Sequence, residues 1–188
     1  KENNYPNIFS NSFLLRNIHT KKNKKILLSK KLNNEIFKKN ILSCNSVFIK
    51  KNIFNQYKFS EDKDLAGSED WDLWLRVASF EDIIGNRVIS SIFIDHSLRS
   101  TRNQKLEKIN TRINTLYQRV NNKKIFQLGS KLSYVKSEIY SFKALISASF
   151  IKYKFYSLRL LILSIYYRPF RIFEKRTVAI LKKIIVEF

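Results

Sequence analysis

The chain has 188 residues, of which 44% are hydrophobic, so it can form a folded domain and is not generally disordered. Its single cysteine, Cys44, excludes an internal disulfide, and with only three glycines a glycine-rich phosphate-binding loop is disfavoured. Basic residues outnumber acidic residues 36 to 15, which gives a formal net charge of +21.

A charge of this sign attracts polyanions such as nucleic acid or acidic lipid. Lysine outnumbers arginine 25 to 11, whereas phosphate and base recognition favour the arginine fork. The excess of Lys, Asn, Ile and Phe is typical of an AT-rich genome, so we attribute the charge chiefly to composition and expect nucleic acid not to be a partner. The acids are less evenly spread, because nine of the fifteen lie between Glu61 and Asp95. An active site that handles protons or metal ions explains such a concentration.

The first part of the chain predicts short strands and loops. Two apolar pieces, residues 8–15 and 26–32, are separated by a basic run at 21–25, which is typical of a solvated loop. Residues 41–50 predict a strand, because Val-Phe-Ile follows a small polar cluster at 43–46. Residues 54–66 predict a loop.

A helix is predicted after the break at Gly67. Ser68 is the expected N-cap, and Glu69 and Asp70 occupy the first turn, where the helix dipole favours acids. One apolar stripe follows at helical spacing: Trp71, Trp74, Leu75 and Ala78. Both tryptophans fit a core, and Trp71 also fits the border of a pocket because it lies beside the acids.

The remaining sequence predicts one strand and then helices alone. Residues 83–85 predict a turn into a strand at 87–94 that ends before His96, and 103–120 predict an amphipathic helix. Three further helices are expected at 134–153, 155–167 and 172–186, with Arg168-Pro169 as a break. Residues 144–167 are the most apolar, but three basic residues interrupt them too early for a transmembrane span. The last helix is basic and amphipathic, and either lies on anionic lipid or packs on the preceding helices.

The string Glu69-Asp70-Trp71-Asp72-Leu73-Trp74-Leu75-Arg76 resembles the Glu-Asp motif helix of family 2 glycosyltransferases with the GT-A fold. The expected strands on either side, and the helical pair with its final proline, are similar to the surroundings of that motif. The resemblance implies an α/β fold: the C-terminal half of a GT-A, Rossmann-like domain in residues 1–102, followed by a helical tail in residues 103–188. It implies that the N-terminal nucleotide-binding half is absent, so we expect a C-terminal piece of a longer protein that is inactive alone.

The function implied by the resemblance is transfer of a sugar, with inversion, from a nucleotide-diphosphate sugar to an acceptor hydroxyl in the synthesis of cell-surface polysaccharide or another glycan. The implied partners are the nucleotide-diphosphate sugar and a glycan or lipid-linked acceptor. The implied cofactor is a divalent metal, Mg²⁺ or Mn²⁺, held mainly by an Asp-x-Asp motif in the absent half. Asp62-Lys63-Asp64 has that spacing, but it does not follow a buried strand, so we do not assign it the metal. We expect a cytoplasmic location, including the cytoplasmic face of the membrane.

The resemblance also implies roles for individual residues. Asp70 is the expected catalytic base, with a pKa lowered by its place at the helix start, and Glu69 orients the site or contacts the acceptor. His96 is the expected metal or diphosphate ligand, and Arg99 a diphosphate contact. Further expected substrate contacts are Trp71, Ser43, Asn45 and Ser46. Arg76 is expected to pair with a nearby carboxylate, and Cys44 to be buried and inert.

Three alternatives remain open from the sequence. Glu69 and Asp70 can simply cap their helix. The chain can be a basic nucleic-acid-binding module, although its bases are spread along the whole sequence rather than clustered. It can also be a helical module that lies on a membrane surface without catalysis, with peripheral membrane contact through its C-terminal helices.

Overall fold

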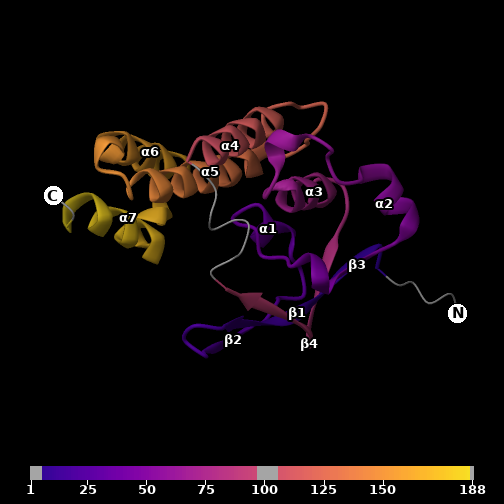
Figure 1. The fold of residues 1–188 in the computed structure, drawn as a ribbon. Helices are drawn as coiled ribbons and strands as arrows, with labels where there is room; N and C mark the ends of the chain where they lie inside the picture. The colour runs from indigo at the N-terminus through magenta and orange to yellow at the C-terminus, as the bar shows by residue number, and fades with distance from the viewer. Residues whose placement is uncertain (1–5, 97–105, 187–188) are drawn as a thin grey trace, which may run out of the picture.

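The computed structural model describes residues 6–96 and 106–186, which form a mixed α/β fold (Figure 1). Within these residues there are four strands and seven α-helices. The strands are β1 (Ile8–Asn17), β2 (Asn23–Ile26), β3 (Val47–Ile49) and β4 (Ile83–Asp95). The helices are α1 (Asn33–Ile36), α2 (Lys51–Tyr57), α3 (Glu69–Ala78), α4 (Leu106–Val120), α5 (Leu132–Ser147), α6 (Lys154–Tyr167) and α7 (Lys175–Val186).

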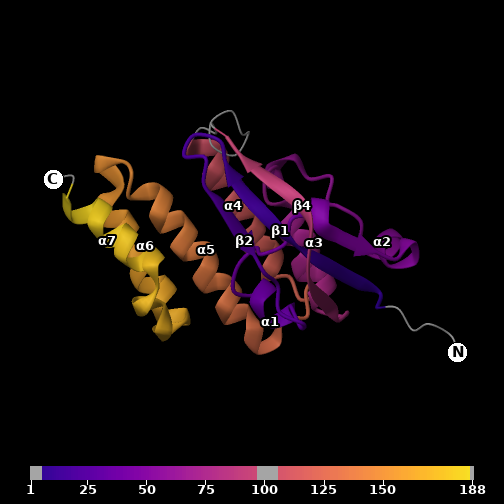
Figure 2. The same cartoon turned by 90° about the horizontal axis from the view of Figure 1, so that it is seen from below.

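The sheet is organised around β1. Strand β4 runs parallel to β1 along its length, from the pair Ile8–Ile83 to the pair Asn17–Asp95. Strands β3 and β2 pair antiparallel with the first and second halves of β1. Figure 2 shows β1 and β4 side by side, with α6 and α7 at the far end of the molecule. The sheet is therefore mixed, and α6 and α7 lie away from it.

Three expectations about local structure are wrong. The basic run expected as a loop is a loop only at Lys21 and Lys22, because Lys24 and Lys25 belong to β2, a short strand with an exposed surface. Part of the expected loop at 54–66 belongs to α2, which buries only Ile53. The expected turn at 83–85 is the start of β4, where Gly85 passes so close to the chain that an added Cβ would lie 1.9 Å from the backbone oxygen of Ser29.

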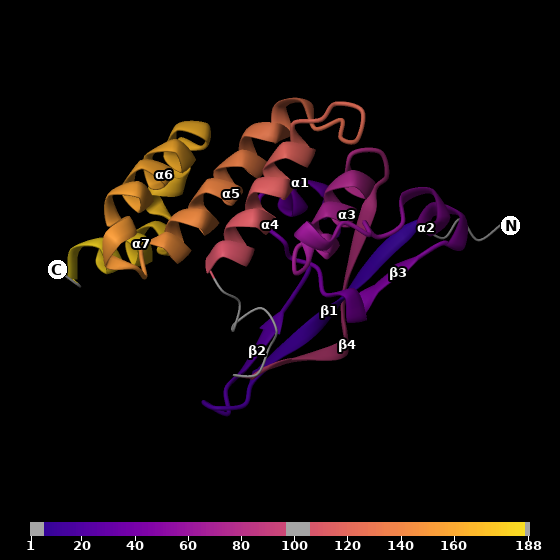
Figure 3. The ribbon, with the colours of Figure 1, turned by 45° about the horizontal axis from the view of Figure 1, so that its top comes forward.

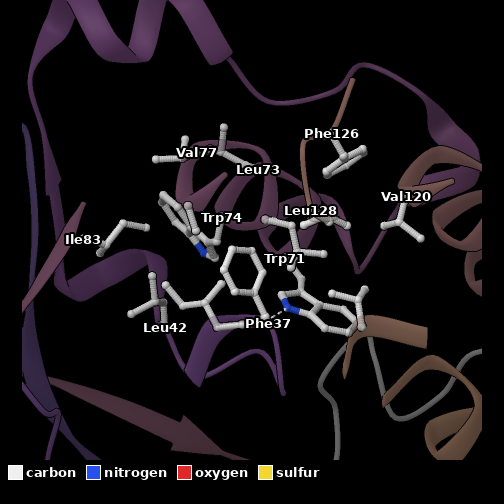
Figure 4. Close-up of a cluster of buried hydrophobic side chains, with 14 of the residues drawn as sticks. Phe37, Leu42, Trp71, Leu73, Trp74, Val77, Ile83, Val120, Phe126 and Leu128 are labelled. Carbon is white, nitrogen blue, oxygen red and sulfur yellow. Dashed lines mark hydrogen bonds between the residues drawn. The ribbon is translucent and has the colours of Figure 1, made fainter. Parts of the chain in front are cut away.

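Helix α3 lies at the centre of the main hydrophobic core, as its apolar stripe predicted. Trp71, Trp74, Leu75 and Ala78 are all buried. Figure 4 shows the two tryptophans among side chains from the preceding loops, the sheet and the tail, including Phe37, Leu42, Ile83, Val120, Phe126 and Leu128. The core thus joins the residues before 102 to those after it, and the expected domain boundary falls in the part of the chain outside the described residues.

The tail is a set of packed helices beyond α3 (Figure 3). Helices α5 and α6 approach closely through small residues, because Ser137 and Ser164 exchange hydrogen bonds with each other's backbone oxygens at 2.7 Å. Pro169 ends α6, as expected, and begins the short 3₁₀ helix η5 (Pro169–Phe173). Helix α7 then packs on α5 and α6 through Ile180 and Ile184. Among the described residues no helix is long and apolar enough to cross a bilayer.

Candidate functional site

Asp70 lies at the junction of two cavities. The helix-side cavity, of about 290 Å³, is enclosed by the start of α3 and by α4, α5 and Arg176 of α7. The sheet-side cavity, of about 420 Å³, is enclosed by β1, β4 and residues 39–43. Four residues line both: Lys39, Asn40, Gly67 and Asp70. These volumes suit a ligand of the size of a sugar residue.

The carboxylate of Asp70 is held in a fixed direction. Oδ1 accepts the backbone N–H of Trp71 at 2.7 Å, and Oδ2 accepts the side-chain amide of Asn40 at 3.0 Å. Burial raises the pKa of Asp70 above its ordinary value, and the hydrogen bonds from Asn40 and Trp71 oppose the shift without reversing it. The expectation of a lowered pKa is therefore wrong, because desolvation outweighs the helix-start effect. A carboxylate with a raised pKa is a stronger base.

Glu69 and Ser68 shape the turn before α3. Ser68 occupies the N-cap position, as expected, but its side chain makes no capping hydrogen bond. Glu69 instead turns back, and its Oε2 accepts the backbone N–H of Gly67. Gly67 has a φ of 92°, in the region that favours glycine, so this pair fixes the turn that brings Asp70 to the cavities.

Trp71 belongs to both the core and the site. Its indole Nε1 donates to the backbone oxygen of Ile36 at 3.0 Å, which satisfies the buried ring nitrogen. The residue is 8% exposed and lines the helix-side cavity next to Asp70. The hydrogen bond thus holds the ring in place while the residue lines the helix-side cavity.

A buried charge cluster holds α3 in place. The fully buried carboxylate of Asp72 accepts from Arg76 at 2.9 Å and from Arg119 of α4 at 2.8 Å and 3.1 Å. Arg76 also donates to the backbone oxygens of Tyr57 and Lys58. The expectation that Arg76 pairs with a nearby carboxylate is confirmed. Sequence reasoning missed Asp72 and Arg119, since nothing in the pattern of α4 marked Arg119 as a partner of α3.

The polar cluster before β3 divides into different environments. Ser43 is buried and lines the sheet-side cavity with Asp70, so the structure brings these two predicted residues together. Ser46 is also buried, and its hydroxyl donates to the Ser43 backbone oxygen at 2.9 Å and lies 3.3 Å from the Ser10 hydroxyl. Asn45 is exposed. Of these three residues, Ser43 is the one that lines the sheet-side cavity.

Cys44 is exposed, which corrects the expectation that it is buried. Protein atoms nevertheless crowd its thiol, and this desolvation, together with the negative charges of Asp70 and Glu69, raises the pKa of Cys44 to about 11. The thiol is therefore protonated at neutral pH and a poor nucleophile, in line with the expected inertness. The raised pKa also indicates that the negative charges of Asp70 and Glu69 act on the Cys44 thiol.

Four cationic or amide side chains at the cavities were missed from the sequence: Lys39, Asn40, Arg112 and Arg176. Arg112 is 4% exposed, and its Nη1 lies 3.4 Å from the backbone oxygen of Gly67. Burial lowers the pKa of Arg112, and the charges of Glu69 and Asp70 act against that shift. A signal existed, because Arg112 lies on the apolar stripe of α4 between Ile109 and Leu116, where a charge is unexpected.

The predicted ligand His96 lies directly after the end of β4. His96 is half-buried and follows Asp95, whose Oδ2 accepts from Asn17 at 3.1 Å. Phe93 lines the sheet-side cavity with Asp70, so this end of β4 faces the site. Arg99 lies outside the described residues.

The side chains of the described residues do not by themselves fit a divalent metal. Within residues 6–96 and 106–186, no three His, Cys, Asp or Glu side chains gather as a metal site requires. Asp62 and Asp64 lie in an exposed turn, where Asp62 accepts the backbone N–H of Asp64 at 3.0 Å. His96 would supply a single ligand, and we assign no chemical step to a metal.

Comparison with known proteins adds no relative: no protein-family model matches the chain, and no curated protein and no solved structure is significantly similar to it. Any function must therefore be proposed from the sequence motif of α3 and from the geometry around Asp70.

Proposed function

We propose that this chain is the acceptor-side part of a family 2-like glycosyltransferase with a GT-A-type domain, in which Asp70 is the catalytic base. One observation carries the proposal: Asp70 is a rigidly held carboxylate, with a raised pKa, shared by two cavities. A residue that only capped its helix would point to solvent at the helix end and would need no cavity on either side.

The chemistry follows from this placement. An acceptor hydroxyl within hydrogen-bond distance of Asp70 transfers its proton to the carboxylate as its oxygen attacks the anomeric carbon of the donor sugar. The bond from that carbon to the diphosphate breaks on the opposite side, which inverts the anomeric centre. The Asn40 amide and the Trp71 N–H hold the carboxylate in one orientation and stabilise its charge before the proton arrives.

The two cavities fit two parts of a substrate. The helix-side cavity has an apolar wall that includes Trp71 and Phe142, and aromatic walls suit the apolar face of a sugar ring. Lys39, which lines both cavities, supplies a positive charge close to Asp70. The nucleotide-diphosphate donor, the divalent metal and roles for His96 and Arg99 rest on the resemblance of the α3 sequence alone.

The test is release of nucleoside diphosphate from a panel of nucleotide sugars, with glycan and lipid-linked acceptors and Mg²⁺ or Mn²⁺ present. The protein is expressed from its complete coding sequence. Asp70→Asn should lower kcat by about a hundredfold or more, because loss of a general base has an effect of that order. Asp64→Asn, which changes an exposed carboxylate in the turn before α3, is the matched control and should leave turnover intact.

Circular dichroism of both variants separates loss of chemistry from loss of fold. Wild-type turnover by Asp70→Asn would remove Asp70 from the mechanism. Absence of turnover by the wild-type protein with every donor would overturn the proposed activity itself.

A further inference from the structure

The most exposed apolar side chains of the described residues gather in the last forty residues. Five are more than three-quarters exposed: Phe155 (87%), Phe173 (82%), Phe170 (78%), Tyr166 (77%) and Ile151 (76%). Elsewhere in the described residues, the most exposed large apolar side chain is Val88, at 59%. Burial of such side chains is favourable, so a surface that displays them together is typical of an interaction site.

These side chains follow the whole length of the α6–α7 pair. Tyr166, Phe170 and Phe173 lie at the connection between α6 and α7, where Pro169 ends the first helix. Ile151 and Phe155 lie at the other end of α6. Lys183 of α7 donates to the Ser149 hydroxyl at 2.7 Å, so α7 runs back along α6 to the same end. Figures 1 and 3 show the pair at the end of the molecule farthest from the sheet.

Basic residues lie between the exposed apolar residues of α6 and of α7. On α6, Arg159 lies one turn after Phe155 and one turn before Ile162, and all three are exposed. On α7, Lys182 lies between Val178 and Ile185 in the same way. Residues 151–186 hold nine basic residues and a single acidic one, Glu174.

Some of these bases are engaged inside the tail and do not contribute to its surface. Arg171 is 1% exposed and donates to Glu138 of α5 at 2.7 Å, while Arg168 pairs with Glu174. Four bases are exposed on the surface: Lys152, Arg159, Lys175 and Lys182. The buried pair Arg171–Glu138 holds η5 against α5, so the exposed aromatic residues of η5 lie on a fixed support.

We propose that this surface, formed by the exposed side chains of α6, η5 and α7 and called here the tail surface, binds an anionic lipid bilayer. Helices that mix large apolar residues with Lys and Arg lie in the headgroup region, where the rings and aliphatic chains enter the acyl boundary and the cations reach lipid phosphates. The proposal is independent of the proposed glycosyltransferase activity.

Charge complementarity favours lipid over a second copy of this chain. A two-fold dimer would bring the tail surface against itself and place Arg159 and Lys182 opposite like charges. An anionic bilayer offers its acyl boundary to the apolar side chains and its phosphates to the cations. We expect the helices to lie at a shallow depth in the bilayer, because none of the described helices is long and apolar enough to span it.

The test is co-sedimentation of the chain with vesicles of phosphatidylcholine, with and without added phosphatidylglycerol. Binding is expected to vesicles that contain phosphatidylglycerol and to weaken as salt is raised. Phe170→Ser combined with Phe173→Ser should weaken vesicle binding about tenfold or more, because two exposed rings lose their place in the bilayer. Arg159→Gln combined with Lys182→Gln should weaken vesicle binding and reduce its salt dependence, because two of the four exposed bases are lost.

The matched control is Val88→Ser combined with Ile92→Ser, which removes two exposed apolar side chains from β4 and should leave vesicle binding unchanged. Thermal unfolding of each variant verifies the fold. Wild-type vesicle binding by the double phenylalanine variant, an equal loss in the β4 control, or no binding to anionic vesicles would each overturn the proposal. So would a dimer that the phenylalanine variant abolishes in the absence of any vesicle binding, because the tail surface would then be a contact between copies.

Discussion

Arg119 of α4 donates two hydrogen bonds to the carboxylate of Asp72 on α3, from Nε to Oδ1 at 2.8 Å and from Nη2 to Oδ2 at 3.1 Å. Asp72 is fully buried, and Arg76 bonds the same carboxylate from one turn away. The pair joins the helix that carries Asp70 to the first helix of the tail. The tail therefore takes part in positioning the site and is not an independent appendage.

Removing Arg119 should destabilise the chain. Arg119→Met keeps the aliphatic part of the side chain but, among the described residues, leaves Asp72 with Arg76 as its one cationic partner, so we expect a loss of about 2–3 kcal/mol in the free energy of unfolding. Urea denaturation followed by tryptophan fluorescence measures it. Arg87→Met, at an exposed position of β4, should change stability by less than about 0.5 kcal/mol. If the two substitutions lowered the free energy of unfolding equally, the Arg119–Asp72 pair would contribute no more to stability than an exposed arginine does.

Gly85 and Gly129 offer a second comparison. Gly85→Ala would place a Cβ 1.9 Å from the Ser29 backbone oxygen, so the start of β4 must shift, and we expect a loss of about 3 kcal/mol or more. At Gly129 nothing lies within 4 Å of the added Cβ, and only its φ of +50° opposes alanine, which costs about 1 kcal/mol. Urea midpoints rank the two variants, and a reversed order would mean that β4 adjusts freely at Gly85.

The elements that the sequence predicted well are those with a periodic buried face. Helix α3 carries four apolar residues at helical spacing after a glycine break, and these signals agree with one another. Strand β2 and helix α2 lack such a face. The lysines of β2 point to solvent beside β1, and α2 buries Ile53 alone, so tertiary contacts rather than local pattern decide both elements.

The part of the site that lies on α3 was predictable from the sequence, because α3 has a periodic buried face. Asp70 and Trp71 follow from the sequence of α3, whereas Asn40 and Arg112 reach the cavities from segments 30 and 42 positions away in the chain. The sign of the pKa shift of Asp70 was wrong because a helix start is visible in a sequence and desolvation is not. Burial of a charge depends on what packs over it, and here that includes the tail.

The raised pKa of Asp70 has a consequence for stability. The folded chain holds the Asp70 proton more tightly than the unfolded chain, so the ionised carboxylate destabilises the fold at neutral pH and not below its ordinary pKa of 3.8. Asp70→Asn should therefore stabilise the chain at pH 7, and the gain should disappear as the pH falls towards that value. Thermal unfolding across this range measures it, with Asp64→Asn as the exposed control. A variant less stable than the wild type at neutral pH would contradict the burial argument.

Cys44 provides a chemical probe of the same charges. Its pKa of about 11, against an ordinary 9.0, lowers the thiolate fraction about a hundredfold near neutral pH, so alkylation by iodoacetamide should be slow although the residue is exposed. Desolvation is the main cause and stays in every variant. The negative charge of Asp70 is the next cause and that of Glu69 the third, so Asp70→Asn should speed alkylation about threefold and Glu69→Gln somewhat less, since removing a nearby negative charge lowers a thiol pKa.

The rate of Cys44 alkylation against pH, followed by mass spectrometry, distinguishes these effects. Asp64→Asn should leave the profile unchanged, and alkylation in urea should be fast in all variants because unfolding restores the ordinary thiol pKa. A profile that Asp70→Asn does not move would mean that the Asp70 carboxylate is not ionised beside Cys44. A carboxyl that is not ionised at neutral pH cannot accept the proton of an acceptor hydroxyl, so the alkylation profile also tests the condition on which the role of Asp70 as a base depends.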